Sequence, residues 1–459
     1  MTEPQRTPYS SIAGLAWPAL PPATGQAMLA LCFQLDLSQW LDTQTLRQQQ
    51  LRQLRRLVEF AHAHVPHYRG HLARAGIAGA AAIDAESFLR WPLLTKTEIR
   101  EHGQDLVANG LPASHGSISW STTSGSTGQP LRAGTSGIAA LFQQALLLRM
   151  QSWYGVDPQS KLAVIRMTAE TPYSGSWGAP TDLAFRTGPA VKLSAFESHE
   201  KQLDWLCREQ PGCLIVHNAN LQALLRRSRL HGKAPRGLRT VMGFSDMASP
   251  GMRSMVRDIW NAVYFDTYSC AELGPLALQC REHANLHLQS ERVFLEVLGA
   301  DGAPCAAGEI GRVVVTDLHN FAMPLIRYDL GDYARLGPPC PCGRGLPVLA
   351  GIAGRGGQTA VDPAGRSFFP RLNFDFWLDV ATVQQWQVAQ LAPADLEVRY
   401  VAERDLTADE QSQLTSEIRK AMRYDYRIAF TRLAVIAHAP GGKFDDFVSL
   451  QHHQRATDG

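Results

Sequence analysis

The run Thr123-Ser124-Gly125-Ser126-Thr127-Gly128-Gln129-Pro130 concentrates glycine and hydroxyl residues in one short loop. Glycine lets the backbone turn its N–H groups inward at positive φ, and the hydroxyls add donors for phosphate oxygens. The run lacks the Lys-Ser/Thr ending of a Walker motif, so it is not that kind of nucleotide site. A flexible Ser/Gly linker is the alternative interpretation. The loop alone therefore indicates an anion site that needs support from the rest of the chain.

The segments around this loop predict an α/β architecture. Leucines recur at helical spacing over about 38–75, where a proline at 66 should end or kink the helix, and a second helix is expected over about 136–154. Further along, short apolar runs alternate with helical stretches, as in a sheet covered by helices. The runs expected to be buried strands are 162–166, 213–217, 238–243 and 262–266.

The pattern changes after residue 308, where antiparallel strands are expected. A helix over about 407–424 should begin at the capping box formed by Thr407 and Glu410. The glycine-rich run at 354–357 is the best candidate boundary. We therefore expect an N-terminal domain over 1–353, a hinge over 354–357 and a C-terminal domain over 358–459. The expected antiparallel strands are 311–316, 383–390, 396–401 and 432–437.

Length and composition exclude several classes of protein. A chain of 459 residues is too long for one ordinary core, and its 45% hydrophobic and 19% charged residues are typical of globular proteins. Its 44 basic and 42 acidic residues form no block dense enough to follow a nucleic-acid backbone. The start shows no secretory signal, no apolar run is long enough to span a membrane, and the eight cysteines do not form a disulfide framework. A cytoplasmic enzyme without nucleic-acid or membrane partners is expected.

Four further motifs follow the Ser/Gly loop in order. Together with the loop they resemble the motifs of the adenylate-forming superfamily of acyl-CoA synthetases, nonribosomal adenylation domains and luciferases. Within it, the Glu272-to-Pro275 ending, the Pro324-to-Arg327 lead-in and the Cys-Pro-Cys-Gly-Arg run resemble the phenylacetate–CoA ligase branch. The resemblance implies a large N-terminal α/β domain of adenylate-forming type and a small mobile C-terminal α+β domain. The four motifs are Tyr268-Ser269-Cys270-Ala271-Glu272, Arg327-Tyr328-Asp329-Leu330-Gly331-Asp332, Gly354-Arg355 and Gly441-Gly442-Lys443.

The resemblance implies that these motifs bind ATP. Tyr268 would stack on adenine, and Asp332 would accept the ribose hydroxyls because a carboxylate offers two acceptor oxygens. Without the family resemblance, a simple turn residue after Gly331 is an equally good interpretation of Asp332. The loop residues that would hold the phosphates are Thr123, Ser124, Gly125, Ser126, Thr127 and Gly128.

Four charged residues would act on the phosphates by the same resemblance. Glu272 would help hold Mg²⁺, because a hard cation takes carboxylate oxygens. Lys443 would enter from the small domain and stabilise the pentavalent phosphorus with its compact charge. Arg327 could pair with phosphate or with a structural carboxylate, and Arg355 could contact ribose or phosphate. Without the family, Glu272 and Lys443 are ordinary solvated charges.

The chemistry expected of such a site is activation of a carboxylic acid. The carboxylate attacks the α-phosphate of ATP, pyrophosphate leaves, and the resulting acyl adenylate has AMP as a good leaving group. The protein mainly aligns the reactants and stabilises charge, so no side-chain nucleophile is needed. Neither Ser124 nor Cys270 has a recognisable local histidine partner, which argues against covalent catalysis.

A second set of residues suggests a metal. Cys340 and Cys342 place two thiols close together, and Cys280 with His287 adds an upstream pair. Four such ligands with no water position make a closed, structural zinc site, and the phenylacetate–CoA ligase branch carries a similar pattern. His283 is an alternative fourth ligand. Buried cysteines and surface histidines without a metal are the other interpretation.

The hinge differs from the superfamily pattern. The superfamily usually places acidic residues after Gly354-Arg355, whereas this chain has Gly356-Gly357-Gln358. These glycines permit rotation but remove the side chain that would define two hinge positions. Acid activation is still expected, while the acyl acceptor stays open between coenzyme A, a carrier-protein thiol and an amine.

The acid is expected to bind where aromatic and amide residues gather. The segments that should line its pocket are 177–181, 217–220, 244–246 and 268–271, and their composition suits an aryl or similarly small apolar acid. The residues expected to contact the acid are Phe244, Ser245, Ser269, Cys270 and Ala271.

Two other functions compete with this interpretation. One is a pseudoenzyme of the same fold that binds nucleotide without turnover, suggested by the altered hinge. The other is a zinc hydrolase, which is weaker because a catalytic zinc keeps an open position and is usually supported by a general base. A homodimer fits the phenylacetate–CoA ligase branch, although no residue pattern requires it.

Overall fold

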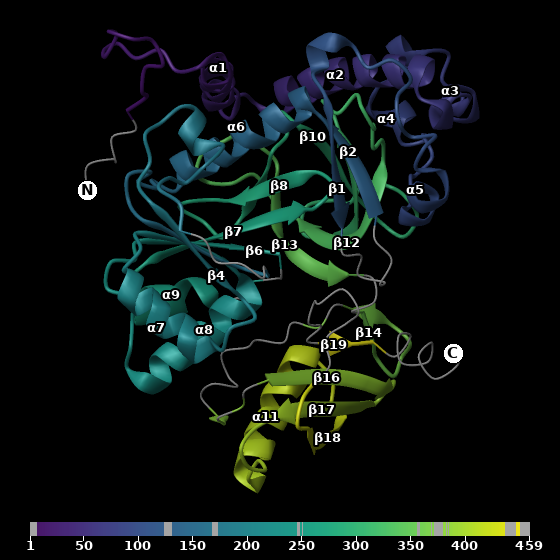
Figure 1. Ribbon diagram of the computed structural model, residues 1–459. Helices are drawn as coiled ribbons and strands as arrows, with labels where there is room; N and C mark the ends of the chain where they lie inside the picture. The colour runs from purple at the N-terminus through teal and green to yellow at the C-terminus, as the bar shows by residue number, and fades with distance from the viewer. Residues whose placement is uncertain are drawn as a thin grey trace.

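The computed structural model describes residues 7–123, 131–167, 173–245, 248–249, 251–355, 359–368, 370, 380–381, 383, 385–436 and 447–449. The chain has a large body built on one 11-stranded sheet and, nearer the C-terminus, a separate four-stranded sheet (Figure 1). None of the helices in these ranges is both long and apolar enough to cross a membrane. The mixed α/β class expected from the sequence is confirmed.

The N-terminal part is helical. Helix α1 spans Ala23–Ser38 and α2 spans Thr43–His64, with Asp42 accepting a hydrogen bond from the Thr45 N–H at the start of α2. The helix expected over about 38–75 begins later than predicted, because Asp42 caps a new helix, whereas its expected interruption at Pro66 is confirmed: α2 ends at His64 and Pro66 begins η1. The short elements that follow are η1 (Pro66–Tyr68), α3 (His71–Arg74), η2 (Ala80–Ala82), α4 (Ala85–Phe88), α5 (Lys96–His102) and η3 (Ala113–His115).

One half of the large sheet is parallel. Its strands lie in the order β4-β3-β5-β6-β7, and helices α7, α8 and α9 pack together on one face (Figure 1). All four strands expected in this half are confirmed, although β6 and β7 are shifted or longer than expected. The bounds are β3 (Leu162–Arg166), β4 (Ala190–Ser194), α7 (His199–Glu209), β5 (Cys213–His217), α8 (Asn218–His231), β6 (Thr240–Phe244), α9 (Met252–Trp260) and β7 (Val263–Cys270), with η4 (Thr181–Leu183) before β4.

The other half of the sheet is antiparallel and continues from β7 through β8, β9, β13, β12 and β11 to β10. The strand expected over 311–316 lies here as part of β11, whereas the rest of this half was not predicted. The strand β12 carries Asp329, Asp332 and Arg335, so its sequence lacks the apolar run on which the prediction depended. The bounds are β8 (Gly274–Gln279), β9 (Leu286–Leu288), β10 (Val293–Leu298), β11 (Ile310–Asp317), β12 (Tyr328–Leu336) and β13 (Val348–Arg355).

A two-stranded hairpin stands beside the large sheet. Strands β1 (Ile118–Thr123) and β2 (Leu131–Ser136) pair antiparallel, with Thr123 opposite Leu131. Ser136 then caps α6 (Gly137–Trp153) by accepting a hydrogen bond from the Ala139 N–H, which confirms the helix expected after the Ser/Gly loop.

The C-terminal sheet has its own hydrophobic core around Trp386, Val398 and Leu414. Strands β16 (Gln385–Ala392) and β17 (Asp395–Val401) form the expected antiparallel pair, and α11 (Ala408–Met422) begins at the expected Thr407–Glu410 capping box. The antiparallel strand expected over 432–437 is wrong. The strand is instead β18 (Arg427–Arg432), which runs parallel to β17 because α11 carries the chain back to the same end of the sheet. The remaining strands are β14 (Ala360–Val361), β15 (Ser367–Phe368) and β19 (Phe447–Val448).

Candidate active site and metal centre

Strands β7 and β12 bring together two residues expected to bind the nucleoside. The hydroxyl of Tyr268 donates a 2.9 Å hydrogen bond to Oδ2 of Asp332, although 64 residues separate them. A bulge between Tyr268 and Ser269 changes the pairing with β8 at this point. Arg355 is the register partner of Asp332 across β12 and β13, so its backbone also belongs to this group.

Glu272 lies in the tight turn between β7 and β8, next to this pair. The hydroxyl of Tyr328 donates to its Oε1 at 3.2 Å, which holds the carboxylate on the same side of the sheet as Asp332. Tyr328 is fully buried, and burial raises the pKa of its hydroxyl, so it stays a donor at physiological pH. No sequence pattern indicated Tyr328 for this contact. Lys96, also not predicted, donates from Nζ to the carbonyl of Leu330 at 2.8 Å and so lies beside β12 just before Asp332.

The β1–β2 hairpin holds the ends of the expected phosphate loop. Asn320, from the segment after β11, accepts from the Ser136 N–H at 3.2 Å and donates to the Gly134 carbonyl at 2.8 Å. Because Asn320 is buried, these bonds fix the hairpin to the large sheet. The loop thus joins two paired strands instead of two independent segments.

Several expected site residues lie outside the described part of the chain. Lys443, Asp246 and the hinge residues 356–358 belong to this group. Thr123 and Arg355 are described through their strands only. The other expected site residues outside the described ranges are those of the loop, Ser124, Gly125, Ser126, Thr127 and Gly128.

Arg327 makes buried structural contacts. Its guanidinium is buried, pairs with Glu296 at 3.1 Å and donates to the carbonyls of Leu89 and Trp91, each at 2.6 Å. Arg327 has a φ of 50°, a left-handed conformation that these contacts hold in place. Of the two roles considered for Arg327, the structure therefore supports pairing with a structural carboxylate and corrects its assignment as a catalytic residue.

The carboxyl ends of the parallel strands carry the residues expected to face the acid. Phe244 is the last residue of β6, and Ser245 follows it with a φ of 77°. Ser269 and Cys270 end β7, and Ala271 follows in the turn to β8. Burial raises the pKa of the Cys270 thiol well above its usual range, so Cys270 is a poor nucleophile.

A buried hydrogen-bond network centred on Asn218 supports this edge of the sheet. Asn218 accepts from the Tyr264 hydroxyl at 2.8 Å and donates to Oδ1 of Asp266 at 3.0 Å, which joins β7 to the start of α8. Asn218 is only 1% exposed, so it supports the pocket and does not line it. The expected pocket segment 217–220 is therefore corrected at this residue.

Trp177 lies at the opposite edge of the sheet. Its indole Nε1 donates to the Ser160 carbonyl at 2.9 Å, and Ser160 precedes β3 at its amino end. Thr181 exchanges hydrogen bonds with Gln151 of α6 and is buried. The expectation that 177–181 lines the acid pocket is therefore wrong, because the sequence does not reveal to which edge of the sheet this loop returns.

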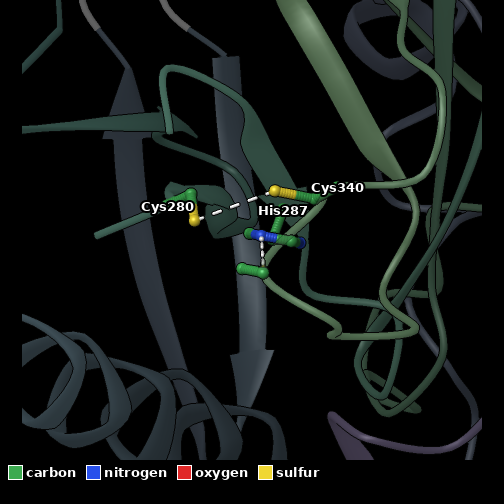
Figure 2. A group of neighbouring side chains, drawn as sticks. Cys280, His287 and Cys340 are labelled. Atoms are coloured by element: carbon green, nitrogen blue, oxygen red, sulfur yellow. Dashed lines mark hydrogen bonds between the residues drawn. The ribbon is translucent and has the colours of Figure 1, made fainter. Parts of the chain in front are cut away.

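The four expected metal ligands meet in one place. The ligand atoms of Cys280, His287, Cys340 and Cys342 all lie within 4.8 Å of one another. The sulfurs of Cys280 and Cys340 are 3.9 Å apart (Figure 2). The Cys342 sulfur is 3.4 Å from Nε2 of His287. His283 is not part of this group. Three thiols and one imidazole are the donor set of a closed tetrahedral zinc site, so the residues fit that ion.

The protonation of the group also suits a metal. Nδ1 of His287 lies 3.3 Å from the Leu346 carbonyl, an arrangement in which Nδ1 carries the proton and Nε2 offers its lone pair to the cysteines. Burial lowers the pKa of His287 to about 4, which keeps it neutral. Burial also acts to raise the pKa of the Cys342 thiol, but hydrogen bonds from Arg344 outweigh it and the net shift is downward.

The loop that follows Cys342 contacts the N-terminal helices. Arg344 donates to Oε1 of Gln39 at 2.8 Å, and its guanidinium lies 4.9 Å from the ring of Trp40 and 4.6 Å from that of Trp153. The Gly345 N–H donates to the Gln39 carbonyl at 3.0 Å. The loop that carries two of the cysteines thus holds the junction between α1 and α2 against the sheet.

Comparison with known proteins agrees with this geometry. No family model matches the chain. The chain is 27% identical over 328 residues to the phenylacetate–coenzyme A ligase of Thermus thermophilus, covering 69% of this chain and 71% of the relative. It is 24% identical over 311 residues to the Escherichia coli phenylacetate–coenzyme A ligase, covering 66% and 70%.

A solved structure shares the fold over most of the chain. The 2-hydroxyisobutyryl-CoA ligase in its postadenylation state superposes with a TM-score of 0.72 at 20% identity, covering 91% of this chain and 92% of the ligase. By sequence the chain is similar to the phenylacetate–coenzyme A ligases, and by fold it is similar to the 2-hydroxyisobutyryl-CoA ligase.

Proposed function

We propose that this protein activates a carboxylic acid with ATP and transfers the acyl group to coenzyme A. The observation that carries the proposal is the joined pair Tyr268–Asp332, with Glu272 in the adjoining turn. Two far-separated motifs of an adenylating site meet there with their polar atoms in contact. The similarity to enzymes named phenylacetate–coenzyme A ligases supports both the activation step and the acceptor.

In the first step a carboxylate oxygen attacks the α-phosphorus of ATP. A new O–P bond forms, the bond to the β-phosphate oxygen breaks, and pyrophosphate leaves. Tyr268 would pack against adenine while its hydroxyl keeps Asp332 turned toward the ribose hydroxyls. Magnesium, held with the help of Glu272, would neutralise the phosphate charge, and Lys443 would stabilise the charge that accumulates at phosphorus.

In the second step the thiol of coenzyme A loses its proton and attacks the acyl carbon. A C–S bond forms, the C–O bond to AMP breaks, and AMP leaves. The division at the glycine-rich hinge, with domains over 1–353 and 358–459, would let the small domain carry Lys443 out of the site between the steps. The group of Cys280, His287, Cys340 and Cys342 offers the four donors of a closed site. A zinc ion held there would act as a structural support only.

The first test is ATP–pyrophosphate exchange with a panel of aryl and short acyl acids. Exchange with at least one acid supports activation, whereas a complete absence of exchange from folded, zinc-replete protein favours the pseudoenzyme. Coenzyme A is then added, and AMP release without hydroxylamine identifies it as the acceptor. If AMP appears only with an amine or a carrier protein, the acceptor in this proposal is wrong.

The second test addresses the role of Asp332 in the Tyr268–Asp332 pair. Asp332→Asn removes one carboxylate oxygen that would accept from ribose, and we expect the KM for ATP to rise about ten-fold or more, since hydrogen bonds to charged groups contribute about 1.5–3 kcal/mol. Asp301→Asn is the matched control, because Asp301 lies in an exposed turn and accepts only from the Ala303 N–H in its described contacts. An unchanged KM in Asp332→Asn contradicts the ribose assignment.

A further inference from the structure

Arg166 ends β3 at the same edge of the sheet as the expected acid site. Its guanidinium carbon lies 5.3 Å from the centre of the Phe244 ring. The His217 ring meets the same phenyl ring, with 4.3 Å between the ring centres. These residues end β3, β5 and β6, and the carboxyl ends of parallel strands are where α/β sheets bind ligands.

No acidic residue in the described ranges pairs with Arg166. Arg166 is exposed at the end of β3, but partial loss of surrounding water still lowers the pKa of its guanidinium, and no carboxylate among the described residues acts in the opposite direction. Two exposed apolar residues lie near this strand end: Met167 follows Arg166 in the chain and is 53% exposed, and Phe196 is 74% exposed. The Ala195 N–H donates to the Arg166 carbonyl at 2.8 Å, which brings the loop of Phe196 to the same place. A partly desolvated cation among apolar side chains is suited to an anion carried on an apolar body.

The strand order gives the distance from this cation to the adenylation residues. From β3 to β7 the order is β3-β5-β6-β7, and three steps between strands amount to about 14 Å. Arg166 leans toward β6, so its guanidinium lies on the order of 10 Å from the β7 residues. A para-disubstituted benzene ring spans this distance once a hydrogen bond of about 2.9 Å is added.

We propose that Arg166 determines substrate specificity by binding a second anionic group at the far end of the carboxylic acid. This inference rests on the proposed acid activation and names the class of acid: a molecule with the reacting carboxylate at one end and a second negative charge across an aromatic or similarly apolar body. Phe244 supports the guanidinium through its ring face, and the apolar side chains beside it receive the body of the acid.

The test compares two acids of equal shape. The anionic one is 4-sulfophenylacetate, whose sulfonate cannot itself be activated, and the neutral one is 4-sulfamoylphenylacetate. ATP–pyrophosphate exchange is measured without any acyl acceptor, so the readout reports the acid and not the phosphates of coenzyme A. We expect wild-type kcat/KM to favour the sulfonate by about ten-fold or more, as for one charge-assisted hydrogen bond.

Three variants test the assignment to Arg166. Arg166→Gln should reduce the preference for the sulfonate to near one, and Arg166→Lys should keep part of it because the charge remains. Arg257→Gln, which alters an arginine of α9 paired with Asp258, should keep the full preference. Melting temperatures equal to wild type show that each variant is folded.

Each result decides between outcomes. Equal use of both acids by wild-type protein, or an equal loss with both acids in Arg166→Gln, overturns the inference while leaving acid activation intact. The same holds if Arg166→Gln affects only the later step with coenzyme A, which would assign the cation to the acceptor. Exchange with neither acid nor any other acid refutes the proposed function itself.

Discussion

Gly243→Ala is a small change that should strongly disturb the edge of the sheet at which we propose that the acid binds. A Cβ atom at this position would lie 1.9 Å from Oδ1 of Asn218 and 2.7 Å from both the ring and the hydroxyl of Tyr264. Asn218 and Tyr264 are each 1% exposed. The new methyl therefore displaces Asn218, and the Tyr264 hydroxyl and Asp266 lose the hydrogen bonds that join them through this amide.

The magnitude follows from the two effects. Inserting a methyl group into a filled site costs about 1–3 kcal/mol. A buried polar group left without its partner costs about 1–3 kcal/mol more. A loss of about 3 kcal/mol would lower the melting temperature of the large body by roughly 4 °C, because about 350 residues at about 2.1 cal/mol/K each give an unfolding entropy of about 0.7 kcal/mol/K. Because Gly243 directly precedes Phe244, exchange with any acid should fall as well.

The assay is thermal unfolding followed by ATP–pyrophosphate exchange, with Gly351→Ala as the control. Gly351 lies in β13 with open space where its Cβ would be, so this variant should change stability by less than about 1 kcal/mol. If Gly243→Ala melts with the wild type and keeps its exchange activity, the Asn218 network is not the rigid support described above.

Three other predictions can be measured on the same protein. Lys443→Ala should slow adenylation by about two or more orders of magnitude by removing a transition-state charge, and full exchange activity would exclude this lysine from the mechanism. Cys340→Ser should lower zinc content and melting temperature together, whereas Cys207→Ser on α7 should change neither; stoichiometric zinc in Cys340→Ser would show that the ligand set is wrong. Burial lowers the pKa of His71 from 6.5 to about 4, so the unfolded chain binds more protons between these values and stability falls as pH falls through this range. We expect His71 to account for about 2 kcal/mol of loss at pH 5, and thermal unfolding of His71→Phe should show a smaller loss between pH 7.5 and pH 5 than wild type does.

The parts of the fold that the sequence predicts are those with continuous apolar runs. Strands β3 and β5 begin and end where expected, because buried parallel strands need apolar residues on both faces. Strand β12 was missed because Asp329 and Asp332 interrupt its apolar pattern. Both charged side chains have partners on other strands, because Asp329 pairs with Arg312 and Asp332 accepts from Tyr268, so tertiary contacts override the local pattern there.

The site shows a similar division. Motif resemblance chose Tyr268 and Asp332, and the structure brings them into contact. It did not choose Arg166, which belongs to none of the five motifs. Arg166 is singled out only by the strand order, in which β3 and β6 lie on either side of β5 and its guanidinium reaches Phe244. Resemblance also could not assign Arg327, because a buried ion pair and a phosphate contact require the same residue type.

The choice of metal ligand depended on strand pairing. His283 and His287 are both near Cys280 in sequence, and spacing alone favoured His283. Strand β9 pairs with β8 on one side and with β13 on the other, which places His287 inside the sheet beside the cysteine loop. His283 remains in the turn before β9, where its carbonyl accepts from Arg253. Tertiary pairing, which the sequence does not reveal, makes this selection.

The position of the cysteines also bears on the order in which the protein folds. Cys280 and Cys342 are 62 residues apart (342 − 280), and His287 comes from a strand that needs two partners. A high-affinity zinc site would therefore be complete only after the antiparallel half of the sheet has closed and the α1–α2 junction has docked on Arg344. Metal uptake during refolding would then follow sheet formation, so its rate would report when the antiparallel half of the large sheet has been assembled.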